Sequence, residues 1–125
     1  MRATVETITK EELSKALGND RPVLIDLRLN WAAGSLKIKT AVHEEAEDVD
    51  NWASRYASDQ MIVLYCSTPA EKTSRATAQK LLQKGFSRVK VLRGGWVMWQ
   101  TSDLPVQRKD KAPTPKGIIR EVLSD

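Results

Sequence analysis

The chain has 125 residues and a mass of 14.0 kDa, which fits one domain of ordinary size. Hydrophobic residues make up 41% of it and charged residues 29%, so the composition is globular and excludes collagen-like, low-complexity and disulfide-rich chains. One cysteine and one histidine exclude an intrachain disulfide and a cysteine-rich zinc site. Any chemistry must therefore use that thiol, hydroxyls, carboxylates or the backbone.

The formal net charge of +4 is mild, and residues 107–125 supply half of it with five basic and three acidic residues. A nucleic-acid groove needs basic residues clustered on one face, so we expect no nucleic-acid partner. No stretch approaches the ~20 apolar residues that span a bilayer, and the N-terminal segment lacks the apolar run of a signal peptide. We expect a cytoplasmic protein without a membrane span.

The first predicted element is a helix that begins after Thr9 and ends at Gly18. Thr9 and Glu12 have the spacing of a capping box, in which each side chain binds the other residue's backbone N–H. Ile8 and Leu13 stand at the flanking positions of a hydrophobic staple. These signals together fix the start of the helix.

Three short apolar runs predict strands: residues 23–27 (VLIDL), 61–66 (MIVLYC) and 88–92 (RVKVL). The first two runs are apolar on both faces, which favours a parallel sheet that is covered on both sides. A further short strand is expected near Ala41 and Val42, within an otherwise irregular segment.

Helical patterns separate these strands. Residues 49–56 form a plausible short helix, and residues 74–84 form a clearer one with Gly85 as its stop. Another short helix follows the turn at Gly94 and Gly95 and closes before Pro105. Alternating strands and helices predict an α/β fold with right-handed crossovers.

We expect one three-layer α/β domain over residues 1–106, with a central, mainly parallel sheet and helices on both faces. Residues 107–125 form a basic C-terminal tail without periodicity. Within this tail, residues 118–123 are able to form one helical turn that docks on the core.

Cys66 is the last residue of the most hydrophobic predicted strand. Ligands of open α/β sheets bind beyond the carboxyl ends of the strands, where loops run into helices. The loop of residues 67–73 is long enough to form a nest of backbone N–H groups, which would stabilise a thiolate with help from the helix dipole. Lys72 and Arg75 would add positive charge. The competing interpretation is an inert thiol that packs as a small hydrophobe.

Several short motifs occur in a fixed order along the chain. They are Asp-x-Arg at 26–28, Tyr-Cys at 65–66, Gly-Phe at 85–86, and Gly-Gly-x-x-x-Trp followed by Leu-Pro at 94–105. In this order and spacing they resemble the single-domain rhodanese (rhodanese-like sulfurtransferase) family over residues 7–106. The resemblance implies a rhodanese-like fold and makes Cys66 the nucleophile.

The segment from Cys66 to Ser74 is longer by two residues than the commonest loop of that family. It resembles a subgroup whose loop reads Cys-x-Cys-Pro-Asn-Glu-x-x-Ser. Pro69, Glu71 and Ser74 match this pattern, while Thr68 and Ala70 replace its second cysteine and its asparagine.

The resemblance implies a sulfurtransferase that moves sulfane sulfur from thiosulfate or a persulfide donor to cyanide or a thiol. Cys66 would carry the sulfur as a persulfide, without a metal or an organic cofactor. The partners are then a small anionic sulfur donor and a nucleophilic acceptor. The residues expected to contact substrate are Ser67, Thr68, Ala70, Glu71, Lys72, Thr73, Ser74 and Arg28.

Two alternative functions remain open at this stage. One is a catalytically weak rhodanese-like module that binds or regulates. The other is a cysteine-dependent phosphatase or arsenate reductase, which requires Arg six positions after the cysteine for bidentate oxyanion contacts. This chain has Lys72 there, which favours sulfur chemistry.

Other residues have structural interpretations. Arg28 is either a wall of the pocket or, as we favour, a structural partner of Asp26 or Glu71. His43 lies in an acidic stretch and is expected at the surface rather than as a base. Trp96, Met98 and Trp99 are expected to pack in the core and loops.

Overall fold

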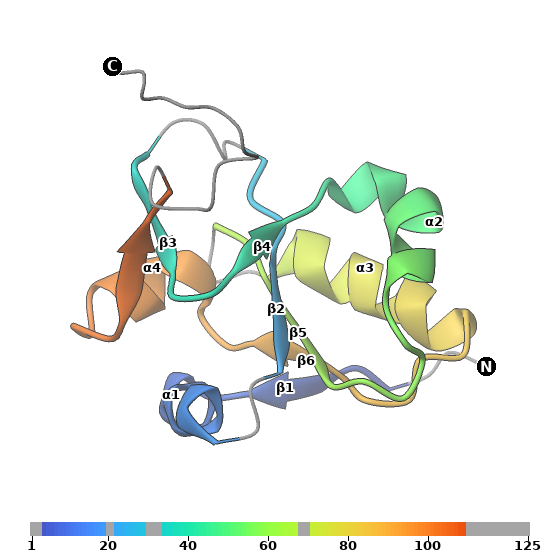
Figure 1. Cartoon of the computed structure of the whole chain (residues 1–125), viewed down its shortest axis with the longest axis horizontal. Helices are drawn as coiled ribbons and strands as arrows, with labels where there is room; N and C mark the ends of the chain where they lie inside the picture. The colour runs from blue at the N-terminus through green and yellow to red at the C-terminus, as the bar shows by residue number, and fades with distance from the viewer. Residues whose placement is uncertain (1–3, 20–21, 30–33, 68–70, 110–125) are drawn as a thin grey trace, which may run out of the picture.

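The computed structural model describes residues 4–19, 22–29, 34–67 and 71–109. In these ranges a five-stranded parallel sheet of order β1-β6-β5-β2-β4 lies beside a two-stranded antiparallel sheet, β3-β7 (Figure 1). The strands are β1 (Glu6–Ile8), β2 (Val23–Asp26), β3 (Leu36–Ile38), β4 (Val42–His43), β5 (Ile62–Tyr65), β6 (Val89–Leu92) and β7 (Val106–Arg108). The α-helices are α1 (Lys10–Gly18), α2 (Val49–Trp52), α3 (Lys72–Gln83) and α4 (Gly95–Gln100), with 3-10 turns at Ala46–Asp48 and Ala53–Arg55.

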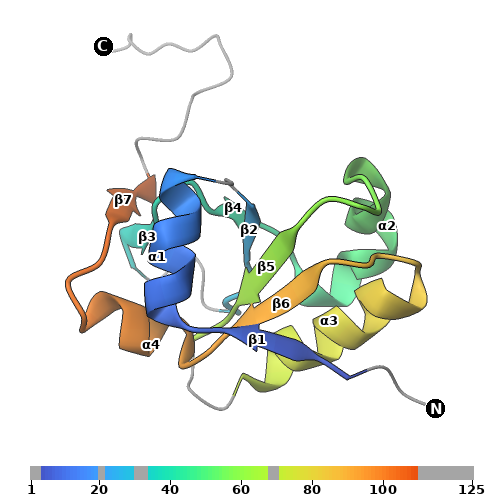
Figure 2. The ribbon, with the colours of Figure 1, turned by 90° about the horizontal axis from the view of Figure 1, so that it is seen from below.

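Helices cover both faces of the five-stranded sheet, with α1 and α4 on one side and α2 and α3 on the other (Figure 2). Successive strand residues alternate between two buried apolar clusters. Ile25 and Leu64 join the cluster beneath α2 and α3, whereas Leu24 and Val63 join the one beneath α1 and α4. This arrangement confirms the predicted three-layer α/β fold and explains why both strand faces are apolar.

The predicted capping box starts α1. Thr9 Oγ1 accepts the Glu12 N–H at 3.1 Å, and Glu12 Oε1 accepts the Thr9 N–H at 2.9 Å. The helix ends at Gly18, as expected. Leu13 is fully buried, so the same turn that satisfies the orphan amides also anchors α1 to the sheet.

The stop of α3 is also confirmed. Gly85 has a φ of +99°, and its N–H donates to Leu82 O while the Phe86 N–H donates to Leu81 O. The start differs from the expectation, because α3 begins at Lys72, two residues before Ser74. The buried Ser74 hydroxyl donates back to Glu71 O, so Ser74 lies inside the first turn.

Three strands, β1, β3 and β7, were not predicted from the sequence. Each has three residues, too few for alternation to be recognised, and β3 pairs with β7 across some 70 residues of chain. β7 runs two residues past Val106, the predicted end of the domain. The possible helical turn at 118–123 lies outside the described residues. Across the described ranges, no helix is long and apolar enough to cross a membrane.

We expect Thr9→Ala to lower the free energy of unfolding by about 1 kcal/mol, because it removes the acceptor for the Glu12 N–H and breaks the reciprocal capping box. Urea denaturation monitored by circular dichroism measures this change. Lys15→Ala, an exposed position on the same helix, is the control and should shift the midpoint much less. Equal shifts in the two variants would contradict the capping argument.

Candidate active site

Cys66 follows directly after β5, the strand between β6 and β2 in the sheet. Its side chain is 6% exposed, and its Sγ lies 3.4 Å from Ser74 Oγ in the first turn of α3. Its carbonyl oxygen accepts the Trp96 N–H at 2.8 Å. The start of α3 and the start of α4 thus hold the cysteine from two directions.

Ser74, an expected substrate-contacting residue, lies within hydrogen-bonding distance of the sulfur. Its hydroxyl is fully buried and also reaches Glu71 O at 3.2 Å. Because the one hydroxyl proton of Ser74 is donated to Glu71 O, Ser74 Oγ accepts a hydrogen bond from the Cys66 thiol in this geometry. A turn of the same hydroxyl away from Glu71 O would let it donate to a Cys66 thiolate.

Glu71 makes contacts within the protein through both carboxylate oxygens. Oε2 accepts the Gly94 N–H at 2.8 Å, and Oε1 accepts from Arg75 Nε at 3.1 Å and from Arg75 Nη2 at 2.9 Å. The Glu71 side chain is 8% exposed. Arg75, which was expected to add charge near Cys66, here neutralises Glu71.

Lys72 and Thr73 line a hollow whose lining does not include Cys66. It lies on the side of α3 that faces the Ala46–Asp48 turn, and its other lining residues include Glu47 and Lys80. Ser67 is half-buried directly after Cys66. Thr68 and Ala70 lie outside the described residues, so the nest of amides over 67–73 stays a prediction.

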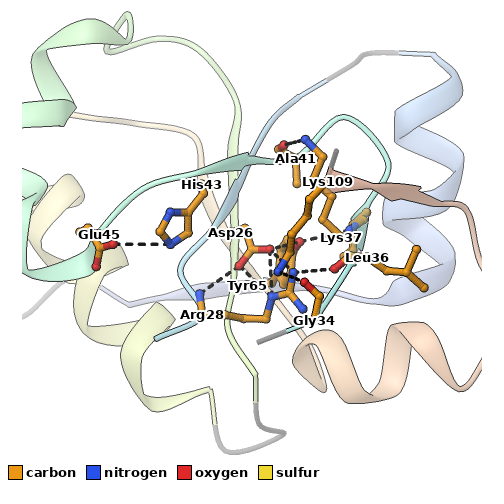
Figure 3. Close-up of polar contacts among 11 residues, drawn as sticks. Asp26, Arg28, Gly34, Leu36, Lys37, Ala41, His43, Glu45, Tyr65 and Lys109 are labelled. Atoms are coloured by element: carbon orange, nitrogen blue, oxygen red, sulfur yellow. Dashed lines mark hydrogen bonds and ion pairs between the residues drawn. The ribbon is translucent and has the colours of Figure 1, made fainter. Parts of the chain in front are cut away.

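Arg28 pairs with Asp26, one of the two partners favoured from the sequence (Figure 3). Its Nη2 lies 2.7 Å from Asp26 Oδ2, its Nε lies 3.0 Å from both carboxylate oxygens, and its backbone N–H also donates to Oδ1. The Tyr65 hydroxyl donates to the same carboxylate at 2.5 Å. Asp26 is fully buried, so these donors replace the water it loses on folding.

Trp96 connects this ion pair to the cysteine. The Arg28 guanidinium lies 4.4 Å from the centre of the Trp96 ring, which also stacks against Tyr65. The backbone N–H of Trp96 donates a hydrogen bond to Cys66 O. From the sequence, Trp96 was expected to pack in the core and loops, and Tyr65 had no expected role in the site. The position of Tyr65 directly before Cys66 was the sequence signal that could have indicated its role.

His43 stands beside Asp26 in the register of β4 with β2. Its Nε2 lies 3.8 Å from Glu45 Oε2, and Glu45 lies on the side of His43 away from Arg28 (Figure 3). The described residues contain no group of three or more His, Cys, Asp or Glu side chains that could hold a metal ion.

The two tyrosines of the chain should keep their protons above pH ~10, where a free tyrosine ionises. Burial and the hydrogen bond to Glu44 raise the pKa of Tyr56 to about 12. Burial and the Asp26 carboxylate raise the pKa of Tyr65 even further. The folded state thus binds these protons more tightly, so the stability from Tyr56 is complete below pH ~10 and is lost as the pH rises toward about 12.

Ultraviolet titration of phenolate measures this difference. The native protein should show no tyrosine ionisation near pH 10, whereas the chain unfolded in guanidinium should ionise both tyrosines there. Phenolate absorbance from both residues near pH 10 in the native protein would contradict the buried hydrogen bonds.

Arg28→Ala should lower the free energy of unfolding by about 3 to 5 kcal/mol, because it leaves the Asp26 charge buried without its main partner. Arg28→Lys should recover only part of this loss, since an ammonium cannot form the bidentate pair. Arg55→Ala is the matched control, because Arg55 is 64% exposed and its buried partner Glu44 keeps the Tyr56 hydroxyl as a second donor, so this loss should be about 1 kcal/mol or less. Urea denaturation tests the ranking, which equal losses in Arg28→Ala and Arg55→Ala would overturn.

Comparisons with known proteins agree with this fold. The model of the rhodanese-like domain family matches residues 9–102. The chain is 28% identical over 107 residues to the thiosulfate sulfurtransferase GlpE of Glaesserella parasuis, covering 86% of this chain and 97% of that one. It is 30% identical over 103 residues to a sulfurtransferase of Allochromatium vinosum, with coverages of 82% and 94%.

A similar solved structure is that of the rhodanese-like domain of an Anabaena protein. It matches with a TM-score of 0.71 at 22% identity and covers 94% of this chain and 89% of that chain. This likeness supports the fold, and the family match covers most of the sequence. The subgroup with the longer loop stays a prediction, since residues 68–70 lie outside the described part. The chain belongs to the rhodanese-like domain family.

Proposed function

We propose that this protein is a sulfurtransferase that carries sulfane sulfur on Cys66 as a persulfide. The observation that carries the proposal is the placement of the one cysteine at the end of a central strand, with Ser74 Oγ 3.4 Å from its sulfur. Relatives that align over most of their length are named thiosulfate sulfurtransferase and sulfurtransferase, which supports the same chemistry here.

In the first step, the Cys66 thiolate attacks the outer sulfur of thiosulfate. A new S–S bond forms to Cys66, the S–S bond of thiosulfate breaks, and its electron pair leaves with sulfite. The enzyme then holds the outer sulfur as a persulfide anion. Ser74 would turn its hydroxyl proton from Glu71 O to the thiolate before the attack, and would donate it to the persulfide afterwards.

In the second step, a nucleophile attacks the terminal sulfur of the persulfide. Cyanide would leave as thiocyanate, and a thiol would leave as a new persulfide, while Cys66 returns to the thiolate. The chain contains no second cysteine to accept the sulfur within the same molecule. The acceptor must therefore come from outside, and the covalent intermediate divides one transfer into two easier ones.

Arg28 and Arg75 fit oxyanion transfer poorly. Phosphatase chemistry needs a guanidinium that is able to bind the oxyanion through two hydrogen bonds. Arg28 is engaged by Asp26, and Arg75 is engaged by Glu71. A persulfide needs stabilisation of a single sulfur anion, which a hydroxyl and nearby backbone amides are able to supply.

Incubating the reduced protein with thiosulfate should add the mass of one sulfur atom, measured by intact-protein mass spectrometry. The gain should vanish in Cys66→Ser and reverse on addition of cyanide, with release of thiocyanate. Cys66→Ser is nearly isosteric, so its circular dichroism should match the wild type. The absence of a mass gain with thiosulfate and with glutathione persulfide would refute the proposal, and hydrolysis of an aryl phosphate would support the phosphatase alternative instead.

A further inference from the structure

Glu71 joins the two chain segments that hold the cysteine. It precedes α3, which carries Ser74, and its carboxylate binds the Gly94 N–H of the loop that leads into α4. The first turn of α4, directly after that loop, supplies the backbone N–H of Trp96 to Cys66 O. We infer that Glu71 is a positioning residue that fixes the Cys66 sulfur relative to Ser74, an inference that rests on the proposed sulfur transfer at Cys66.

Contacts within the protein occupy both oxygens of the Glu71 carboxylate. The side chain is 8% exposed, with Gly94 N–H on one oxygen and the Arg75 guanidinium on the other. Charge-assisted hydrogen bonds of this kind are shorter and stronger than neutral ones. The carboxylate therefore acts as a clamp between α3 and the Gly94 loop rather than as a free anion in the substrate space.

The backbone at Glu71 supports the same conclusion. Its φ of +61° lies in the left-handed region, which disfavours residues with a Cβ atom. Such strained positions persist where the surrounding structure over-determines them, and they concentrate at functional sites. Here the three hydrogen bonds to the carboxylate compensate for the strain.

The partner loop has little freedom to compensate if Glu71 is removed. Gly94 has a φ of +81°, and a Cβ atom built on it would lie 2.3 Å from Met98 Cγ. The Met98 side chain thus packs directly over the Gly94 backbone. Glu71 thus holds the amide of Gly94, and Met98 covers its Cα. The start of α4 is then fixed, so the backbone N–H of Trp96 reaches Cys66 O in one geometry.

The alternative is that Glu71 contacts the sulfur donor, as the sequence resemblance implied. The two roles predict different kinetics. A carboxylate facing an anionic donor would repel it, so its neutralisation would lower the half-saturating thiosulfate concentration. A positioning carboxylate would instead affect the maximal rate of persulfide formation, because small misplacements of reacting atoms act on the chemical step.

The experiment measures persulfide formation in a single turnover at varied thiosulfate concentration, by rapid quench and mass spectrometry. Glu71→Ala keeps a Cβ and therefore keeps the backbone strain while it removes all three hydrogen bonds. Glu71→Gln keeps an acceptor for Gly94 and loses the ion pair. Arg75→Ala removes the pair from the other side, and Glu11→Gln is the matched control, since Glu11 is 73% exposed on α1.

We expect Glu71→Ala to lower the maximal rate by between about 10- and 100-fold with an unchanged half-saturating concentration. Glu71→Gln and Arg75→Ala should fall between this variant and the wild type, and Glu11→Gln should match the wild type. A lower half-saturating concentration with an unchanged maximal rate in Glu71→Gln would overturn the inference, and so would wild-type kinetics in Glu71→Ala.

Amide hydrogen exchange by NMR tests the same inference without sulfur transfer. The Gly94 and Trp96 amides should exchange at least about tenfold faster in Glu71→Ala, as expected for the loss of a hydrogen bond. The Leu13 amide in α1 should be unaffected, which shows that the variant is folded. Unchanged exchange at Gly94 and Trp96 would refute the positioning role. Failure of the wild type to form any persulfide would instead refute the proposed function.

Discussion

The buried carboxylate of Asp26 is the constraint on which the candidate site depends. Hydrogen bonds reach it from the backbone and guanidinium of Arg28 and from the Tyr65 hydroxyl. Arg28 also donates to Leu36 O, and Tyr65 Oη accepts the Ile38 N–H. One charge that must be satisfied on burial thus fixes the ends of β2 and β5 to β3, and thereby the residue directly before Cys66.

A second set of contacts fixes the cysteine from the helix side. Glu71 joins α3 to the Gly94 loop, and Trp96 links that loop both to Cys66 O and to the face of Arg28. The two sets therefore meet at Trp96. Its side chain lies against the buried ion pair while its backbone holds the cysteine, so displacement of either set is transmitted to the sulfur through one residue.

The layers and most elements were predictable because local signals determine them. The capping box at Thr9, the stop at Gly85 and the apolar strands all act over a few residues. The short strands β3 and β7 were not predictable, since their pairing depends on contacts distant in sequence. The place of Cys66 between a strand and the next helix could be predicted, because it follows from the order of these elements along the chain. The roles of Glu71 and Trp96 could not, because they arise from a loop that returns from 23 residues later.

The antiparallel pairing of β3 with β7 has a mechanical consequence. A pull on the chain beyond Lys109 reaches Lys109 first, whose N–H donates to Ser35 O, and then passes to Arg108, which pairs with Leu36, and on to Gln107 and Val106. Hydrogen bonds loaded in this direction open one after another rather than together. β3 itself remains anchored at Leu36 O by Arg28 and at the Ile38 N–H by Tyr65. Tension at this end would therefore peel away β7 and leave the walls around the cysteine in place.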